Sequence, residues 1–354
     1  MVDMTQPAPA APVMTDVARL AGVSHQTVSR VVNGSPHVSE HTRARVLAAM
    51  QELGYRRNAA ARALATRRSG TLGVITFETV LYGPVSTLYS VELAASTVGL
   101  GVSIAVVDRM VPSVVQRALA RLEEQSVEGV VALAPQQDAV EVLTAGLRTV
   151  PTVFVGGILG GVGDESGAPA VHAVGIDQRG GAEAATRHLL DLGHRTVHHL
   201  AGPQDWMDAR WRVEGWRATL VAAGAPVPEH VTGDWSARSG YIGMQRLLAA
   251  DPDLTAVFIA NDPMTLGALR ALDEAGRRVP DDVSLVGFDD VPEAEFFRPP
   301  LTTVRQLFPE AGRRAVQQLL DIIRPDPDRP VAEGPSPELV PTELVVRQSS
   351  APVS

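Results

Sequence analysis

From residue 71 onward, short apolar segments rich in β-branched residues alternate with segments of helical periodicity, such as 113–125 and 179–192. Strands that alternate with helices form parallel sheets, because each return to the same sheet needs a crossover connection. The apolar segments are LGVIT, VSIAVV, GVVALA, TVFVGG, AVGID, TVHHLAG, AVFIAND and VSLVGFDD. These segments are too many for one typical sheet. The sequence therefore predicts an α/β core of two lobes with doubly wound parallel sheets, divided near Asp177.

The end of the chain is expected to cross back between the lobes. LTTVRQ has the pattern of a strand, a helix is predicted from about Pro309 to Ile323, and ELVVR is predicted to be the last strand after a proline-rich stretch. The expected boundaries are about 70–175 with 305–335 for the N-terminal lobe, about 176–304 with 336–348 for the C-terminal lobe, and 349–354 for a tail.

The first 70 residues have a different pattern, which predicts three short helices. Thr15, Ser24 and Ser39 stand where each helix begins, and Gly22 lies in the short joint between the first two. Hydroxyl side chains cap helix N-termini, and glycine commonly ends helices. Two helices joined by a short turn with glycine are typical of a helix-turn-helix domain. We expect an all-α domain of this kind at 14–57, after a Pro- and Ala-rich disordered arm at 1–13 and before a hinge helix and linker at 58–69.

The charge of the chain is divided unevenly. Residues 1–70 contain 9 arginines and 4 acidic residues, whereas the remainder contains 22 basic and 36 acidic residues, for an overall net charge of −9. A basic segment joined to an acidic body indicates a local site for a polyanion. The N-terminal domain is therefore the expected nucleic-acid contact.

Several classes of protein are excluded by what the sequence lacks. The chain contains no cysteine, so it has no disulfide or thiolate site. It has no apolar run long enough for a membrane span and no secretory leader, which favours a cytoplasmic protein. VGGILGGVG lacks the ending of a phosphate-binding loop. His194, His198 and His199 do not make a metal site, because neighbouring strand residues face opposite ways. We expect no enzyme, no metal and no cofactor.

The second helix of the head carries hydrogen-bonding side chains in its first turns. A major groove admits one helix and is read by such side chains; Gln26 can pair with adenine and Arg30 with guanine. The alternative is an ordinary polar helix face. In the hinge segment, Leu64 is a candidate wedge for the minor groove, with arginines beside it for phosphates. The alternative there is that Leu64 packs on its own domain.

These features occur together with a series of family motifs. The blocks are DVARLAGVSHQTVSRVVNG, the hinge Asn58–Ala65, HLAGP, ARWRVEGW, GDWSARSG, ANDPMTLGALR, VSLVGFDD and PPLTTVRQ. In this order, spread over nearly the whole chain, they resemble the LacI/GalR family of transcriptional regulators. The resemblance implies a core like that of periplasmic sugar-binding proteins. It also implies a homodimer that binds a pseudo-palindromic, double-stranded operator, with Leu64 of both subunits at the operator centre.

The DNA contacts that follow come from the head and the hinge. They are Thr15, Ser24, His25, Gln26, Thr27, Ser29, Arg30, Asn33, His37, Asn58, Ala61, Arg62, Leu64 and Ala65. Two positions depart from the family pattern. Arg57 replaces the usual proline before the hinge, and His25 stands where a lactose-responsive member has tyrosine. The operator sequence therefore cannot be transferred from that member.

A ligand site is expected where the sheets' strands end, because doubly wound sheets bind ligands beyond those ends. By resemblance to the family's sugar site, the polar set is Arg212, Asn261 and Asp289, and the apolar walls are Trp235 and Phe308. The N-terminal lobe is expected to add Leu81, Tyr82 and Pro84. Its polar contact is left open among Gln136, Gln137 and Asp138.

Three polar residues in or beside this set have structural alternatives. Arg210 could form a structural ion pair. Asn261 at a strand-to-helix turn could be only an N-cap, and Asp290 could cap a loop. Paired carboxylates for hydrolysis at 289–290 are disfavoured, because adjacent residues at a strand end diverge.

The expected function is a repressor of a carbohydrate-utilisation operon that a sugar, most simply a glycoside, releases from its operator. The alternatives are a non-sugar effector or a corepressor and, more remotely, a sugar-binding uptake protein. We expect a dimer, since the leucine-heptad tail of tetrameric members has no counterpart after Arg347.

Overall fold

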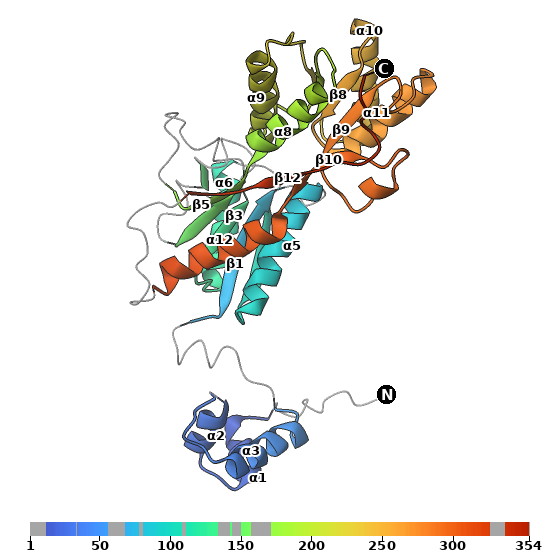
Figure 1. The fold of residues 1–354 in the computed structure, drawn as a ribbon. Helices are drawn as coiled ribbons and strands as arrows, with labels where there is room; N and C mark the ends of the chain where they lie inside the picture. The colour runs from blue at the N-terminus through green and yellow to red at the C-terminus, as the bar shows by residue number, and fades with distance from the viewer. Residues whose placement is uncertain are drawn as a thin grey trace, which may run out of the picture. The chain divides into compact units, whose positions relative to one another are not determined.

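The structure is a computed structural model that describes residues 12–32, 34–55, 68–77, 81–107, 111–133, 142–143, 150–156, 171–325 and 337–353. The chain divides into two compact units, Met1–Ser69 and Gly70–Ser354 (Figure 1). Residues 1–11 of the predicted arm, the hinge residues Asn58, Ala61, Arg62, Leu64 and Ala65, and Asn33 and 136–138 lie outside the described residues.

The N-terminal unit contains the predicted helices α1 (Met14–Ala21), α2 (His25–Val32) and α3 (Glu40–Glu52). They enclose a small core in which the side chains of Val17, Val28 and Val46 have no exposed surface. Burial of one valine from each helix explains why three helices that are too short to be stable alone fold together.

Two of the three predicted helix caps are confirmed. The hydroxyl of Ser24 accepts a hydrogen bond from the amide of Thr27 at 3.2 Å, and that of Ser39 accepts one from Thr42 at 3.3 Å. The prediction for Thr15 is wrong, because the N-cap of α1 is Val13, two residues earlier, and Thr15 lies inside the helix. The carboxylate of Asp16 takes the capping role by accepting the Val13 amide at 3.0 Å.

The N-terminal lobe of the larger unit has a parallel sheet in the order β11-β5-β4-β3-β1-β2. Its strands are β1 (Thr71–Phe77), β2 (Gly101–Val107), β3 (Val130–Leu133), β4 (Thr152–Val155), β5 (Ala173–Ile176) and β11 (Pro337–Val340). Helices α5 (Tyr82–Thr97) and α12 (Phe308–Ile323) lie side by side on one face of this sheet (Figure 1). Helix α6 (Pro112–Glu124) packs against the other face with a separate set of buried side chains.

The C-terminal lobe has a sheet in the order β12-β10-β9-β8-β6-β7, parallel except for β12 at its edge. Its strands are β6 (His198–Ala201), β7 (Val231–Thr232), β8 (Ala256–Ile259), β9 (Ser284–Asp289), β10 (Thr302–Gln306) and β12 (Thr342–Val345). The helix pair α8 (Gln178–Asp191) and α9 (Met207–Ala222) covers one face, and the pair α10 (Ala237–Ala250) and α11 (Asp262–Glu274) covers the other. A short 3₁₀ helix, η1 (Ala294–Phe296), follows β9.

The predicted two-lobed α/β class is confirmed, but the expected boundaries between the lobes need correction. Within the described residues, the chain crosses between the lobes at residues 177, 307 and 341. Residues 305–306 belong to β10 and hence to the C-terminal lobe, and 337–340 form β11 in the N-terminal lobe. The expected tail is part of the C-terminal lobe: buried Ser349 donates to the Leu285 carbonyl at 2.7 Å and accepts from the Thr302 amide at 2.8 Å. Strand β11 begins with proline and has no long apolar run, so its sequence did not reveal it.

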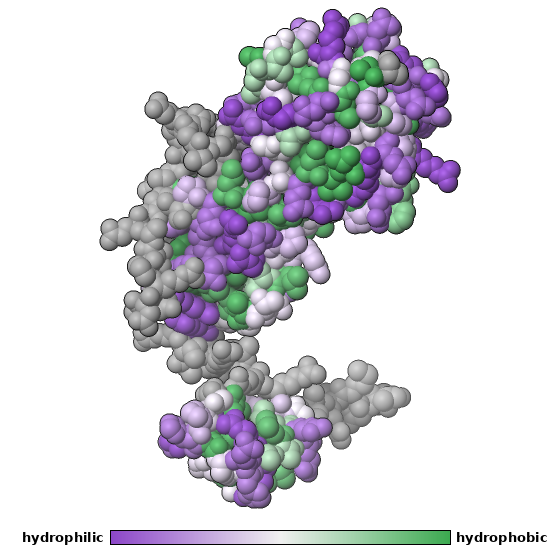
Figure 2. All heavy atoms as spheres, viewed as in Figure 1, coloured by the Kyte–Doolittle hydropathy of each residue, from purple (hydrophilic) through white to green (hydrophobic). Residues whose placement is uncertain are grey.

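In the part of the chain that the structure describes, no helix is both long and apolar enough to span a bilayer. On the face drawn in Figure 2, hydrophilic side chains cover much of both units, and hydrophobic residues gather in separate patches.

Glycines set the close approach of α10 and α11. A Cβ atom on Gly267 would lie 1.8 Å from the carbonyl oxygen of Ala237, which is backbone and cannot rotate away. We expect Gly267→Val to reduce the free energy of unfolding by about 3 kcal/mol, because the two helices must separate. Urea unfolding followed by tryptophan fluorescence measures this change. Ala249→Val, at an exposed site of α10, is the matched control; equal losses in the two variants would contradict the prediction.

Candidate effector cleft and nucleic-acid interface

The carboxyl ends of strands from both lobes face a cleft of about 580 Å³. Every residue predicted for the effector site lines it: Leu81, Tyr82, Pro84, Arg212, Trp235, Asn261, Asp289 and Phe308. Parallel strands end at one edge of their sheet, and this brings side chains distant in sequence to one place.

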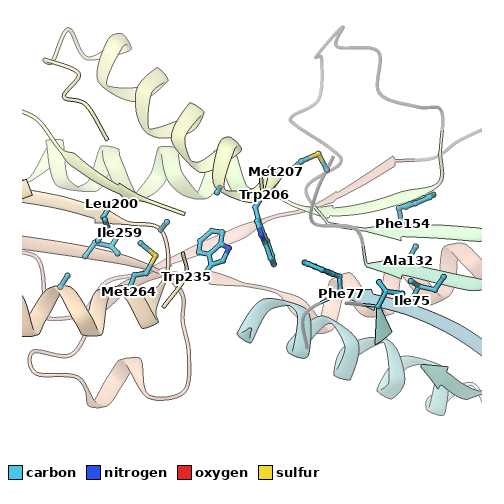
Figure 3. Close-up of a cluster of buried hydrophobic side chains, with 14 of the residues drawn as sticks. Ile75, Phe77, Ala132, Phe154, Leu200, Trp206, Met207, Trp235, Ile259 and Met264 are labelled. Atoms are coloured by element: carbon cyan, nitrogen blue, oxygen red, sulfur yellow. The ribbon is translucent and has the colours of Figure 1, made fainter. Parts of the chain in front are cut away.

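Aromatic rings form the apolar walls of the cleft. On the C-terminal side, Trp206 and Trp235 meet edge to face, with ring centroids 5.7 Å apart. On the N-terminal side, Tyr82 and Phe308 meet in the same way at 5.8 Å. Figure 3 shows Trp206 between Trp235 and Phe77, which lies at the end of β1. Such rings can cover the C–H faces of a bound ring.

The position of Trp235 depends on unusual backbone geometry. Its φ is 71°, a left-handed conformation that non-glycine residues seldom adopt. Its ring lies against Gly202, where an added Cβ would come within 2.2 Å of the indole. Left-handed backbone also occurs at Asp289, with φ 114°. Strain of this kind is typical of functional sites, where the surrounding structure holds it in place.

Arg212 is the central cation of the cleft and is 3 % exposed. Its Nε donates to the Oε1 of Gln178 at 2.9 Å, and its Nη1 donates to the carbonyl oxygen of Ala260. Its guanidinium carbon lies 3.8 Å from the centroid of the Phe288 ring. The Nη2 atom lies 3.9 Å from the Oδ1 of Asp289, which is a loose ion pair. The guanidinium is thus fixed before any ligand arrives.

Two glutamines that sequence reasoning missed complete a chain of hydrogen bonds. Gln178 Nε2 donates to Gln306 Oε1 at 2.8 Å, and Gln306 Nε2 donates to Asp289 Oδ1 at 2.6 Å. Both glutamines line the cleft, and each is next to a crossing between the lobes, at residues 177 and 307. Gln306 is the last residue of the predicted strand LTTVRQ, and this position at a strand end could have identified it from the sequence.

Asn261 has the structural role that the sequence left as an alternative, and it lines the cleft as well. Its Oδ1 accepts the Met264 amide at 2.9 Å as the N-cap of α11. Its Nδ2 donates to the carbonyl of Trp235 at 3.1 Å, so that Asn261 helps to hold the tryptophan. Asp290 is not among the residues lining the cleft: it pairs with Arg305 and Arg347, each at 2.7 Å.

Burial shapes the ionisation of the cleft carboxyl groups. Burial raises the pKa of Asp289 to about 6, although the nearby charge of Arg212 and the hydrogen bond from Gln306 oppose the rise. Burial also raises the pKa of Asp208, again opposed by Arg212. Asp208 was not predicted; it lies in the first turn of α9 and lines the cleft.

The histidines dismissed as metal ligands have other partners. His194 Nδ1 is 2.9 Å from the Thr255 hydroxyl, His198 Nε2 is 3.3 Å from an Asp251 oxygen, and His199 Nδ1 is 2.9 Å from the Phe258 carbonyl. Among the residues that the structure describes, no group of three or more His, Cys, Asp or Glu side chains could hold a metal ion.

Helix α2 has the two faces that the sequence predicts. Val28 and Val31 are buried in the small core, whereas His25, Gln26 and Arg30 are exposed. The other predicted DNA contacts that the structure describes are exposed or partly so: Thr15, Ser24, Thr27, Ser29 and His37. Ser24 and Thr27 also hold each other, with their hydroxyl oxygens 2.9 Å apart. The exposed face of α2 has the size and chemistry to enter a major groove.

The chain was compared with known families and proteins. The family described as "Bacterial regulatory proteins, lacI family" matches residues 13–58, and "Periplasmic binding protein-like domain" matches residues 186–350. The lactose operon repressor of Escherichia coli (strain K12) is 37 % identical over 87 % of this chain and 83 % of its own length. The HTH-type transcriptional regulator CelR of Thermobifida fusca is 38 % identical over 96 % of this chain and 98 % of its own.

Solved structures agree with these relationships. The lac repressor dimer bound to operator and the anti-inducer ONPF has a TM-score of 0.82 at 35 % identity, covering 96 % of this chain and 99 % of that one. The CelR–cellobiose complex has a TM-score of 0.69 at 36 % identity, with the same coverage. These relatives are named as a repressor and a transcriptional regulator, the class of protein that the sequence predicts for this chain. The chain belongs to the lacI family of bacterial regulatory proteins.

Proposed function

We propose that this protein represses a carbohydrate-utilisation operon and that a sugar bound between the two lobes releases it from a pseudo-palindromic operator. The observation that carries this proposal is the cleft, in which fixed Arg212, Asn261 and Asp289 face aromatic walls. Donors and acceptors beside aromatic rings suit a sugar, which has hydroxyls at its edge and C–H groups on its faces. The related CelR–cellobiose complex supports a sugar, and a glycoside is the simplest choice.

The acting species is a homodimer, with one recognition helix for each half-site of the operator. The lac repressor dimer bound to operator supports this assignment. The place of action is the cytoplasm, where chromosomal DNA is accessible. Sugar binding favours a second arrangement of the lobes, and that arrangement binds the operator less tightly. Because such coupling is reciprocal, operator must weaken sugar binding by the same factor.

The test is a titration of the full-length protein into a fluorescently labelled operator from near its own gene, at fixed salt. A panel of galactosides, glucosides, pentosides and nucleobases is then added. Release by a sugar is expected. Release only by a nucleobase would show that the effector is not a sugar. Tighter operator binding in the presence of any compound would show that the compound is a corepressor and not an inducer.

The same titration tests the recognition helix. Gln26→Ala is expected to weaken specific operator binding by about 1–3 kcal/mol, since one bidentate base contact contributes about that much. Gln51→Ala, at an exposed site of α3, is the matched control and should leave affinity unchanged. If Gln26→Ala bound operator as tightly as the unmodified protein, α2 would not read bases through this residue.

A further inference from the structure

Asp208 has an environment that its position in a helix does not explain. It lies in the first turn of α9, where a carboxylate commonly interacts with the free amides of the helix N-terminus, yet the N-cap residue is Trp206, whose side chain makes no cap hydrogen bond. Its Oδ1 atom is buried and makes no hydrogen bond within the part of the chain that the structure describes. A buried carboxylate oxygen without a donor is costly. The residue as a whole is half-buried, and it faces the cleft.

Trp235, in the same cleft, has a hydrogen-bond donor without an acceptor. Its indole N–H is buried and has no acceptor among the described residues. The cleft therefore contains one carboxylate oxygen that needs a donor and one N–H group that needs an acceptor. A hydroxyl group supplies both functions, whereas an ammonium group donates only.

The charges that line the cleft are unbalanced. Asp208, Asp289 and Glu293 face a single guanidinium, Arg212, among the described lining residues. The hydrogen bonds of Arg212 go to Gln178 and to a backbone carbonyl, so none of them reaches Asp208. Excess negative charge on the walls of a cleft repels an anion.

We infer that Asp208 is a specificity-determining residue that accepts a hydrogen bond from a hydroxyl of a neutral sugar and excludes phosphorylated and acidic sugars. The inference rests on the proposed function and deepens it, because it names the class of sugar. Asp208 accepts the hydroxyl proton at Oδ1, and Trp235 Nε1 donates to a hydroxyl oxygen of the same ligand.

The experiment is isothermal titration calorimetry on the full-length protein with cellobiose and lactose, their 6-phosphates and their 2-amino-2-deoxy analogues. The unmodified protein is expected to bind a neutral disaccharide and to bind its 6-phosphate at least 100-fold more weakly. Asp208→Asn is expected to lose 10- to 100-fold of the affinity for the neutral sugar, as for other hydrogen bonds to charged groups. The ratio of its affinity for the neutral sugar to its affinity for the 6-phosphate is also expected to fall. A purely structural defect would not change this ratio.

The controls separate the possible failures. Asp253→Asn removes the same charge from an exposed site of the same lobe and should leave both affinities unchanged. Asp208→Glu should restore discrimination against the phosphate. If a neutral sugar binds but Asp208→Asn matches the unmodified protein, the role of Asp208 is wrong and the proposed function stands. Preference for an amino sugar over the neutral sugar would also overturn the role proposed for Asp208. If none of the six compounds binds, the sugar assignment falls and this inference falls with it.

Discussion

Replacing Arg212 by leucine is expected to abolish the response to sugar while the operator still binds. The substitution leaves Gln178 Oε1 and the Ala260 carbonyl without their donor, and Asp208 and Asp289 without a nearby cation. Removing one partner of a buried charge network costs about 3–5 kcal/mol. We therefore expect the free energy of unfolding at pH 7 to fall by about that amount. Sugar affinity should fall at least 100-fold.

Urea unfolding and calorimetric titration measure the two effects, and operator binding reports on the separate N-terminal unit. Arg212→Lys is expected to bind sugar with intermediate affinity, because lysine keeps the charge but loses the planar fork. Arg217→Leu, at an exposed site of the same helix, is the matched control. Sugar binding by Arg212→Leu at the affinity of the unmodified protein would remove Arg212 from the effector site.

The part of the fold that periodicity encodes could be predicted from the sequence. The helices predicted at 113–125 and 179–192 are α6 and α8, displaced by one residue. Most of the apolar strands are buried on both faces, so their composition identifies them. Strand β2, at the edge of its sheet, is the exception, with Ile104 and Val106 exposed. The crossings between lobes were placed less well. Which sheet a strand joins is decided by pairing with distant strands, such as β11 with β5, and no local signal records that choice.

The candidate site, like the fold, could be predicted only in part from the sequence. Resemblance to the family's sugar site predicted Arg212, Asn261 and Asp289, and all three line the cleft. Only Asn261 and Asp289 lie at strand ends, whereas Arg212 lies in α9. Gln178 was not found, since an ordinary polar residue at the start of a helix becomes significant only when Gln306 lies 2.8 Å away. Asp208 was missed for a related reason. An aspartate in the first turn of a helix usually needs no explanation beyond the helix dipole.

Acidification is expected to destabilise the C-terminal lobe through His199. Its ring is fully buried and stacks on Phe258, with centroids 4.6 Å apart. The Nδ1–H donates to the Phe258 carbonyl, and the buried Nε2 has no hydrogen-bond partner among the residues for which the structure gives positions. The pKa of His199 is lowered from 6.5 to about 3, chiefly by burial and also by the nearby His230 and Arg212, while the hydrogen bond to the Phe258 carbonyl partly opposes the fall. Protonation would place a charged N–H in an apolar site without an acceptor.

The sign of the effect follows from proton counting. Between about pH 6.5 and 3 the unfolded chain binds a proton that the folded lobe does not, so the stability contributed by neutral His199 is lost as pH falls through that window. A shift of this size corresponds to about 5 kcal/mol. Burial also lowers the pKa values of His188, His194 and His198, which act in the same direction. Asp289 acts in the opposite direction. Because its pKa is raised in the folded lobe, the folded state takes up this proton before the unfolded chain does, and stability rises as pH falls from about 6 to 4.

His199→Gln keeps a donor for the Phe258 carbonyl but does not titrate. The variant is expected to show a dependence of unfolding free energy on pH that is shallower by about 5 kcal/mol between pH 6.5 and 3. Urea unfolding at a series of pH values, followed by tryptophan fluorescence, measures it, because all four tryptophans lie in the C-terminal lobe. His41→Gln, in the N-terminal unit, is the control and should leave the slope unchanged. If His199→Gln kept the slope of the unmodified protein, other buried groups would have to account for the acid sensitivity.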